Sequence, residues 1–322
     1  MKTEKSEELA DGSQIIAQGK NEVKRERRDG KWCYVKHYLE DDWDATREVI
    51  SKRAELEVQA LRLLHNAEGW PRRLGRVNVV EVNTDSGMIV TEEAPGIGLD
   101  RFIKKYRRSN RKIGLQVFYL AGRWLRHFQQ ISARGVCSEP VGSKNPLDLC
   151  AYVELRIEEL RRRGYRALTD ADWSVVMERL NALDSLIGSS DRQLVLAHCD
   201  YSPCNILTDG NGVTPIDFQM VTLGYSLLDV TYFLHRLEMS TVYRPWMARP
   251  WSSWRRAFTR GYGRTDLQDS ALFKSLMIRQ YVLRILTYTK RKPKSRKQQI
   301  HNLWVLWVLK QKLMKFTKEQ CC

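Results

Sequence analysis

In the first third of the chain, short runs of alternating apolar and polar residues predict a small β-sheet. Strands are expected at residues 13–18, 22–28, 31–39, 76–83 and 87–94. Asp29 and Gly30 separate the second run from the third, and an Asp-Gly pair is typical of a two-residue hairpin turn. The pattern therefore predicts five strands in the first third of the chain.

One helix interrupts these strands. Between residues 43 and 66 apolar side chains recur near helical spacing, at Ile50, Ala54, Leu56, Leu61 and Leu64. Gly69 and Pro71 follow, and both residue types commonly stand just beyond a helix. The expected first unit is thus a sheet that carries a single amphipathic helix.

The pattern changes at Pro95-Gly96, which predicts a boundary between two lobes. Long helical patterns follow near residues 99–107, 113–134, 147–163 and 170–187, and over most of the chain past 225. Short strand-like runs at 193–198, 206–210 and 213–218 lie among them. We expect a flexible segment at 1–12, an N-terminal lobe at 13–95 and a helical C-terminal lobe at 96–322.

Composition is that of a globular chain. Of 322 residues, 43% are hydrophobic, and no run approaches the eighteen or so apolar residues that a membrane-spanning helix needs. The seven cysteines are scattered without metal-ligand spacing, which indicates reduced thiols. These features predict a cytoplasmic protein.

The net charge of +16 predicts an anionic partner, such as a nucleotide, a nucleic acid or an acidic membrane surface. From Arg284 to Lys318 the chain has eleven basic residues and no acidic one. Within this stretch, residues 302–316 read as an apolar helix with a basic end. Two interpretations stay open for it, a membrane-surface element or a helix packed on the core.

Polar residues interrupt the strand-like runs of the C-terminal lobe at fixed spacing. Asp200 and Asn205 are five residues apart across a proline-containing loop, and the turn at 209–212 returns the chain to Asp217. The returning strand should bring Asp217 beside Asn205. A carboxylate and an amide oxygen are ligands suited to Mg²⁺, which leaves Asp200 free to accept a proton.

His198-x-Asp200-x4-Asn205, followed by Ile216-Asp217-Phe218, resembles the catalytic and metal-binding loops of the aminoglycoside phosphotransferase and choline kinase superfamily, relatives of the protein kinases. Asp229 resembles the structural aspartate that follows those loops. The resemblance extends over residues 13–240 and implies an α+β, protein-kinase-like bilobal fold. It also implies a small β-rich lobe with one helix and a larger, mainly helical lobe.

The resemblance implies a role for each loop residue. Asp200 would orient and deprotonate an acceptor hydroxyl, while Asn205 and Asp217 would hold Mg²⁺ on the phosphates of ATP. His198 would brace the loop by hydrogen bonding. Such sites act by positioning and by stabilising charge, so they need charged groups rather than a strong nucleophile.

Nucleotide binding is implied by residues of the first lobe. Lys36 in the segment YVKHY resembles the lysine that contacts nucleotide phosphates, and Glu57 resembles the helix residue that pairs with it. Glu55 lies only two residues from Glu57, and about 100° per residue places the two on different helix faces, so only one can point at Lys36. The hinge backbone from Glu92 to Ala94 would receive the adenine.

Three features depart from the family pattern. The first turn has Gly19 but no glycine-rich phosphate loop, so Lys20 would assist there. Cys199 stands where the family commonly has glycine, and Gln219 stands where an acidic residue is common after Ile-Asp-Phe. Neither Cys199 nor Gln219 removes a predicted metal ligand.

The class of acceptor is predicted from the net charge of the protein and from the absence of a protein-kinase motif. No segment resembles the Ala-Pro-Glu motif of protein kinases, so the resemblance favours a small molecule as acceptor. A protein of charge +16 repels polycationic aminoglycosides, and the segments EVKR and YVKHY faintly resemble lipopolysaccharide-core sugar kinases. The leading hypothesis is a sugar or glycolipid hydroxyl, with peripheral contact to an anionic membrane surface.

Alternatives remain open at this point. One is an aminoglycoside or choline-type kinase, and another is a nucleotide-binding pseudokinase or scaffold, suggested by the missing glycine-rich loop. A nucleic-acid-binding role would explain the charge but not the motif. The sequence leaves the oligomeric state open.

Overall fold

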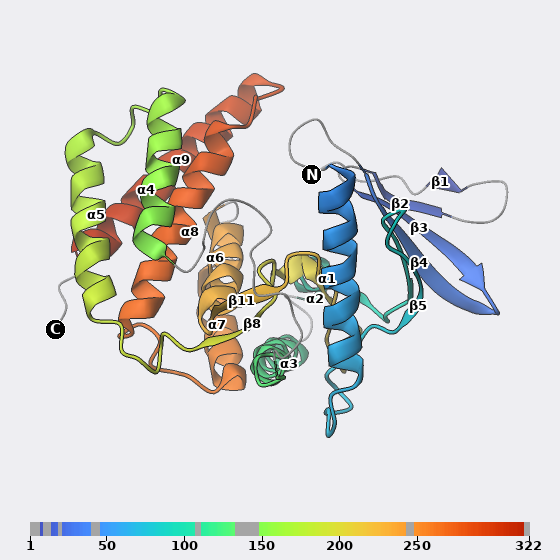
Figure 1. The fold of residues 1–322 in the computed structure, drawn as a ribbon. Coiled ribbons are helices and arrows are strands. Elements are labelled where there is room, and N and C mark those ends of the chain that lie inside the picture. The colour runs from blue at the N-terminus through green and yellow to red at the C-terminus, as the bar shows by residue number, and fades with distance from the viewer. Residues whose placement is uncertain are drawn as a thin grey trace.

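The structure is a computed structural model that describes residues 7–8, 14–18, 21–39, 46–106, 111–132, 148–242 and 248–318. Figure 1 shows two parts, a sheet flanked by one long helix and a larger assembly of helices. This is the α+β, protein-kinase-like bilobal fold that the motif implies.

The first part is a six-stranded antiparallel sheet with strand order β1-β2-β3-β4-β6-β5. Its strands are β1 (Glu7–Glu8), β2 (Gln14–Gln18), β3 (Asn21–Arg28), β4 (Lys31–Tyr38), β5 (Val79–Asn83) and β6 (Met88–Glu92). Asp29 and Gly30 both have positive φ, +47° and +79°, as a tight hairpin with right-handed strand twist requires. The five expected strands are present. Strand β1 is additional and pairs with the outer edge of β2, within the segment predicted to be flexible.

The helix α1 (Arg47–His65) covers one face of this sheet (Figure 1). Thr46 caps its N-terminus by accepting a hydrogen bond from the backbone N–H of Val49. The buried side of the helix, including Ile50 and Ala54, packs against Tyr38 of β4 and Ile89 of β6. The helix thereby acquires a fixed orientation relative to β4, the strand that carries Lys36.

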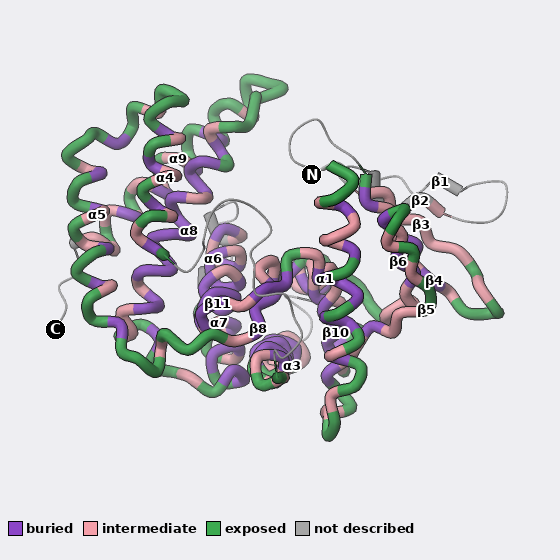
Figure 2. The backbone as a smooth tube through the Cα atoms, in the orientation of Figure 1, coloured by how far each residue is buried: buried purple, intermediate pink, exposed green. Residues whose placement is uncertain are grey.

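The helical part begins with β7 (Ile97–Gly98), which no sequence pattern predicts. Its helices are α2 (Leu99–Tyr106), α3 (Arg111–Gln129), α4 (Leu149–Arg162), α5 (Asp170–Ser185), α6 (Leu228–Val242), α7 (Ala248–Tyr262), α8 (Ala271–Thr289) and α9 (Arg296–Lys318). Figure 2 shows buried positions concentrated where these helices face each other. In the described part of the chain, no helix is both long enough and apolar enough to cross a bilayer.

Helices α3 and α7 approach each other closely at two glycines. A Cβ at Gly122 would lie 2.0 Å from the carbonyl oxygen of Phe258, and one at Gly261 would lie 2.0 Å from that of Tyr119. Only glycine fits at such a crossing. Around it the core is aromatic, with Phe118 stacked on Trp254 at 5.2 Å between ring centroids.

Short strands occupy the space between the two parts. They are β8 (Leu194–Ala197), β9 (Ile206–Thr208), β10 (Thr214–Pro215) and β11 (Thr222–Tyr225), with a 3-10 turn η1 at Pro203–Asn205. Strand β9 pairs with both β10 and β7, and β8 pairs with β11. Strand β11 lies where the sequence shows no strand pattern, and β10 is shorter than the run at 213–218 suggests.

Gly96 precedes β7 with φ of +105°, and a Cβ there would lie 2.2 Å from the carbonyl carbon of Thr208. The chain can therefore cross β9 at this point only with glycine. We propose that the lobes divide here, into residues 13–95 and 96–322.

Candidate active site

The buried carboxylate of Asp229 fixes the loop that follows β8. The backbone N–H groups of His198 and Cys199 donate to the two carboxylate oxygens of Asp229, at 2.7 and 2.8 Å. Asp229 lies in the first turn of α6 and is fully buried, and its burial raises its pKa. The two hydrogen bonds fix the start of the loop to α6.

Asp200 follows in this loop, and each of its carboxylate oxygens accepts a hydrogen bond. Oδ1 accepts from the hydroxyl of Tyr232 at 2.7 Å, and Oδ2 accepts from Nδ2 of Asn205 at 2.8 Å. The same Nδ2 also donates to the backbone carbonyl of Asp200 at 3.0 Å. Because its amide nitrogen is used twice, Asn205 turns its Oδ1 to a different side.

The hairpin from Asn205 to Asp217 closes as the sequence predicts. The backbone N–H of Ile216 donates to the carbonyl of Asn205 at 2.9 Å, and Nε2 of His198 lies 3.1 Å from the carbonyl oxygen of Ile216. His198 therefore braces the two loops. Asp217 has φ of +69°, a conformation that costs a non-glycine residue about 1–3 kcal/mol and that is concentrated at functional sites.

Lys36 of β4 joins the first part of the fold to this loop. Its ammonium lies 2.9 Å from Oε2 of Glu57 and 2.5 Å from Oδ1 of Asp217. Burial by itself would lower the pKa of Lys36, but the two carboxylates outweigh burial and raise it. The lysine therefore stays protonated between two carboxylates.

Glu57 connects three elements through one carboxylate. Besides Lys36, it accepts from the hydroxyl of Tyr38 and, through Oε1, from the backbone N–H of Phe218 at 3.0 Å. Only 5% of Glu57 is exposed. One side chain of α1 thus fixes the positions of both Lys36 and the residue next to Asp217.

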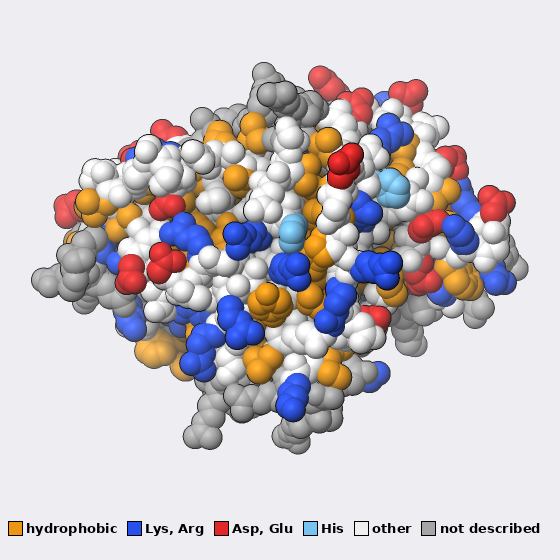
Figure 3. Space-filling model, turned by 90° about the horizontal axis from the view of Figure 1, so that it is seen from below, with side chains coloured by type: hydrophobic (Ala, Val, Ile, Leu, Met, Phe, Trp, Pro, Cys, Tyr) orange, Lys and Arg blue, Asp and Glu red, His pale blue; other side chains and the backbone are white. Residues whose placement is uncertain are grey.

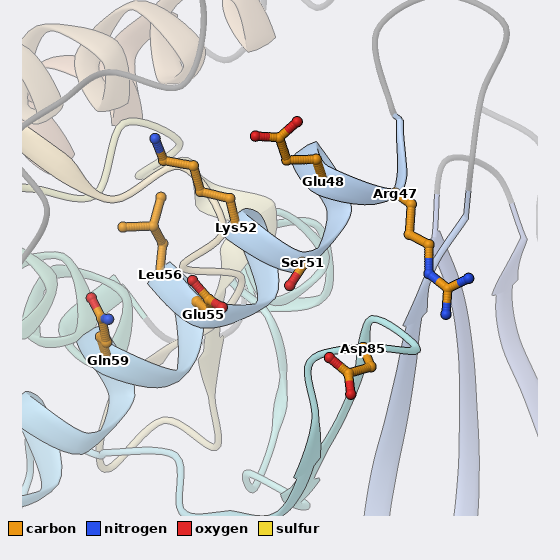
Figure 4. A pocket seen from close by; sticks show the side chains of 8 residues that line it. All are labelled: Arg47, Glu48, Ser51, Lys52, Glu55, Leu56, Gln59 and Asp85. Carbon is orange, nitrogen blue, oxygen red and sulfur yellow. The ribbon is translucent and has the colours of Figure 1, made fainter.

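Glu55 occupies the other face of α1. It lines an open hollow of about 660 Å³ together with side chains such as Arg47 and Ser51 of the same helix and Asp85 of the β5–β6 turn (Figure 4). Of the two glutamates that the sequence left open, Glu57 is the one placed against Lys36.

The hinge after β6 is held by ion pairs. Arg25 donates to both carboxylate oxygens of Glu93, at 2.9 and 2.8 Å, and this hydrogen bonding lowers the pKa of Glu93. The backbone N–H groups of Glu92 and Glu93 donate to the carbonyls of Asn78 and Trp32, both at 2.9 Å. Within the described part of the chain, the N–H of Ala94 makes no backbone hydrogen bond of this kind.

The structure describes the surroundings of two residues that depart from the family pattern, Cys199 and Gln219. Cys199 has φ of +61°, a backbone conformation that glycine adopts without strain. Gln219 accepts a hydrogen bond from Nδ2 of Asn21 at 3.5 Å and so contacts the start of β3. Gly19 and Lys20, the predicted substitutes for a glycine-rich loop, lie outside the described residues.

A family model with the description "Phosphotransferase enzyme family" (APH) matches residues 51–273, more than half of the chain. The chain belongs to this phosphotransferase family. A search of curated protein sequences finds no match.

Solved structures support the same fold for this phosphotransferase. An amicoumacin kinase, hAmiN, in complex with AMP-PNP, Ca²⁺ and Ami is 14% identical, with a TM-score of 0.59, and the match covers 95% of this chain and 89% of that one. A choline/ethanolamine kinase family protein from Mesorhizobium loti is 15% identical, with a TM-score of 0.57 and coverages of 95% and 90%. A thermostable mutant of the aminoglycoside phosphotransferase APH(4)-Ia, in a ternary complex with ADP and hygromycin B, is 13% identical, with a TM-score of 0.62 and coverages of 95% and 94%.

The donor atoms of this phosphotransferase fit a hard divalent cation that carries a nucleotide. Among the described residues no group of three or more His, Cys, Asp and Glu side chains could hold a metal. Asn205 and Asp217 offer one amide oxygen and one carboxylate as donors. Mg²⁺ suits such a site because it commonly binds one or two protein oxygens together with phosphate and water. The remaining Asn205 oxygen and the Asp217 carboxylate supply this chemistry.

Sequence reasoning missed Tyr232, which donates to Asp200 from one turn beyond Asp229 on α6. Burial, followed by the charge of Asp200, raises the pKa of Tyr232, so its hydroxyl stays protonated and remains a donor. The spacing of three residues from Asp229 to Tyr232 is the signal that could have indicated it, because such residues share a helix face.

Arginines surround this part of the site. Arg236 lies one turn after Tyr232, and Arg236 and Arg284 both act electrostatically on the Tyr232 hydroxyl. Arg279 on α8 acts electrostatically on the thiol of Cys199, the residue before Asp200. In the part of the chain that the structure describes, neither Arg236 nor Arg279 has a carboxylate within 4.0 Å. Burial lowers the pKa of Arg236, but nearby groups that include Tyr232 and Asp200 outweigh burial and raise it.

Proposed function

We propose that this protein catalyses the ATP- and Mg²⁺-dependent phosphorylation of a hydroxyl group on a non-protein acceptor. The observation that carries this proposal is the continuous set of contacts from Glu57 through Lys36 to Asp217, together with the Asn205–Asp200 hydrogen bond. These contacts support a site in which Lys36 would bind phosphate, Asn205 and Asp217 would hold the metal, and Asp200 would accept a proton.

Each residue has a distinct task in this proposal. Asp200, oriented by Tyr232 and Asn205, accepts the proton of the acceptor hydroxyl as that oxygen attacks the terminal phosphorus of ATP. The bond from this phosphorus to the bridging oxygen breaks, and ADP leaves. Lys36 binds phosphate oxygens, for which it must exchange contacts with Asp217. The bound Mg²⁺, held by Asn205 and Asp217, would neutralise charge on the phosphates.

The preferred acceptor in this proposal is a sugar or glycolipid. The arginines near Asp200 and the net charge of +16 disfavour a polycationic acceptor. Figure 3 shows basic side chains gathered in the middle of the face seen from below, with acidic side chains mostly towards its two ends. A neutral or anionic acceptor meets no such repulsion.

A second candidate is an aminoglycoside or choline-type kinase. The structural matches favour it, since their names refer to amicoumacin, to choline/ethanolamine kinases and to hygromycin B. A third candidate, a pseudokinase, rests on the missing glycine-rich loop.

The test is Mg²⁺-dependent ATP consumption with a panel of neutral sugars, lipopolysaccharide-core sugars, aminoglycosides and amino alcohols. We expect turnover with a sugar class, at rates that fall when Mg²⁺ is removed by chelation. Turnover confined to a cationic aminoglycoside would overturn the acceptor assignment. Nucleotide binding without turnover on any member would favour the pseudokinase.

A further inference from the structure

Helix α9 is apolar on two opposite faces, one of which is buried while the other keeps large apolar side chains exposed. Its inner face, with Val305, Leu309 and Leu313, is fully buried against the helical core. On the outer face four large apolar side chains are exposed, namely Ile300 at 61%, Leu303 at 61%, Trp304 at 47% and Trp307 at 55%. We call these four residues the outer stripe.

The outer stripe is narrow and continuous. At about 100° per residue its four positions fall within an arc of roughly 100°, opposite the buried positions. The rings of Trp304 and Trp307 stack with centroids 5.2 Å apart and an interplanar angle of 27°. Of the eleven exposed large hydrophobic residues in the described part of the chain, four lie here, so the stripe is a patch rather than scattered exposure.

A basic cluster adjoins the stripe at the turn between α8 and α9. Its exposed members are Arg291, Lys292, Lys294, Arg296 and Lys297. Among the described residues, none of these five forms an ion pair. Figure 1 shows this turn at the upper edge of the helical part, and Figure 2 shows it as exposed. Arg296 and Lys297 lie on the same side of α9 as the stripe, within about 60° of Ile300.

We propose that the outer stripe and the basic cluster together dock this protein onto an anionic lipid bilayer, with α9 lying in the interface. Tryptophan and leucine on one face, with lysine and arginine beside them, are the composition of interfacial helices. Tryptophan favours the headgroup region, and each nearby cation is attracted to anionic lipids. The sequence from Arg284 to Lys318 contains no acidic residue that would repel anionic headgroups.

The charge pattern favours a lipid bilayer over a second copy of this chain as the partner of the outer stripe. A second copy of this chain would bring the same unpaired cations to the interface, and the like charges would repel each other. A bilayer supplies both an apolar layer and negative headgroups, which match the stripe and the cluster at once.

The test is sedimentation of the full chain with phosphatidylcholine vesicles, with and without 30% phosphatidylglycerol, at low and high salt. The variants are Leu303→Ser/Trp307→Ser for the stripe and Arg296→Gln/Lys297→Gln for the cluster. Leu186→Ser is the matched control, because Leu186 is 57% exposed and lies at the end of α5. The same samples are examined for oligomeric state and for ATP turnover.

We expect the wild type and Leu186→Ser to bind the anionic vesicles and to release them at high salt. The stripe variant should bind at least tenfold more weakly, and each lost cation should weaken binding roughly fivefold. ATP turnover on a soluble acceptor should be unchanged, which separates this proposal from the proposed function. Absence of binding to anionic vesicles, or binding that neither variant weakens, would overturn it. If the wild type is a dimer and only the stripe variant is a monomer, the stripe is instead an interface with a second copy of this chain.

Discussion

At the scale of single residues, the hydrogen bonds to Asp200 determine how its carboxylate is presented. Tyr232 and Asn205 each take one oxygen, at 2.7 and 2.8 Å, so the carboxylate has little freedom to rotate. Under the proposed function, Asp200 would need this fixed orientation to act as a general base.

Tyr232→Phe removes one of these hydrogen bonds and keeps the ring. We predict that kcat falls about tenfold, because Asp200 loses part of its orientation, an effect worth about 1.4 kcal/mol. The KM for ATP should not change, since Tyr232 touches neither Lys36 nor Asp217. Steady-state kinetics with ATP varied at saturating acceptor measure both constants. An increase in KM at constant kcat would assign Tyr232 to nucleotide binding instead.

Cys199 provides a second test at this scale, because its positive φ favours glycine. We predict that Cys199→Gly is more stable to urea than Cys199→Ala by about 1 kcal/mol, since both variants lose the thiol and only glycine relieves the backbone. Equal midpoints for the two variants would show that the backbone at this position is not strained.

At the scale of elements, α1, β4 and the loop after β10 meet at Glu57. The sequence predicts the elements well here, because the apolar spacing of α1 and the alternation of β4 are strong patterns. It could not choose between Glu55 and Glu57, since the choice depends on how α1 is rotated against the sheet. That rotation is set by the packing of Ile50 and Ala54 on Tyr38 and Ile89.

Glu57→Gln should lower kcat/KM for ATP at least tenfold, because Lys36 and the N–H of Phe218 lose their shared charged partner. Glu55→Gln is the matched control on the same helix and should behave as the wild type. Equal effects of the two substitutions on kcat/KM would contradict the assigned orientation of α1.

The contact between α6 and α8 gives a pH-dependent prediction. Burial, reinforced by the charges of Arg284, Arg236 and Lys312, holds the pKa of His235 well below its usual value. Because the unfolded chain takes up this proton first, the free energy of unfolding should decrease as pH falls below about 6.5, by up to about 1.4 kcal/mol per pH unit. Urea unfolding of wild type and His235→Gln between pH 7 and 5 measures this slope. A slope that the substitution leaves unchanged would show that His235 is not the group responsible.

Two strands and one site residue could not be predicted from the sequence, because their partners are distant along the chain. Strands β7 and β11 are short and pair with distant partners, so no local alternation marks them. Tyr232 was missed because 32 residues separate it from Asp200, and only the fold brings them together. The motif residues themselves could be found, because Asp200, Asn205 and Asp217 lie on one loop and hairpin.

At the scale of the whole molecule, the two parts of the fold are joined through charge. Lys36 of the sheet forms an ion pair with Asp217 of the helical part, with 2.5 Å between Nζ and Oδ1. The net charge of +16 acts over longer distances, where it attracts anions and repels polycations.

The measurement that tests the central claim most directly compares wild type with Asp200→Asn, in phosphoryl transfer and in ATP binding. The substitution keeps the size of the side chain and removes the proton acceptor. We predict that transfer falls by about 10²–10⁴-fold while the affinity for ATP changes less than threefold. Transfer at the wild-type rate in Asp200→Asn would contradict the account.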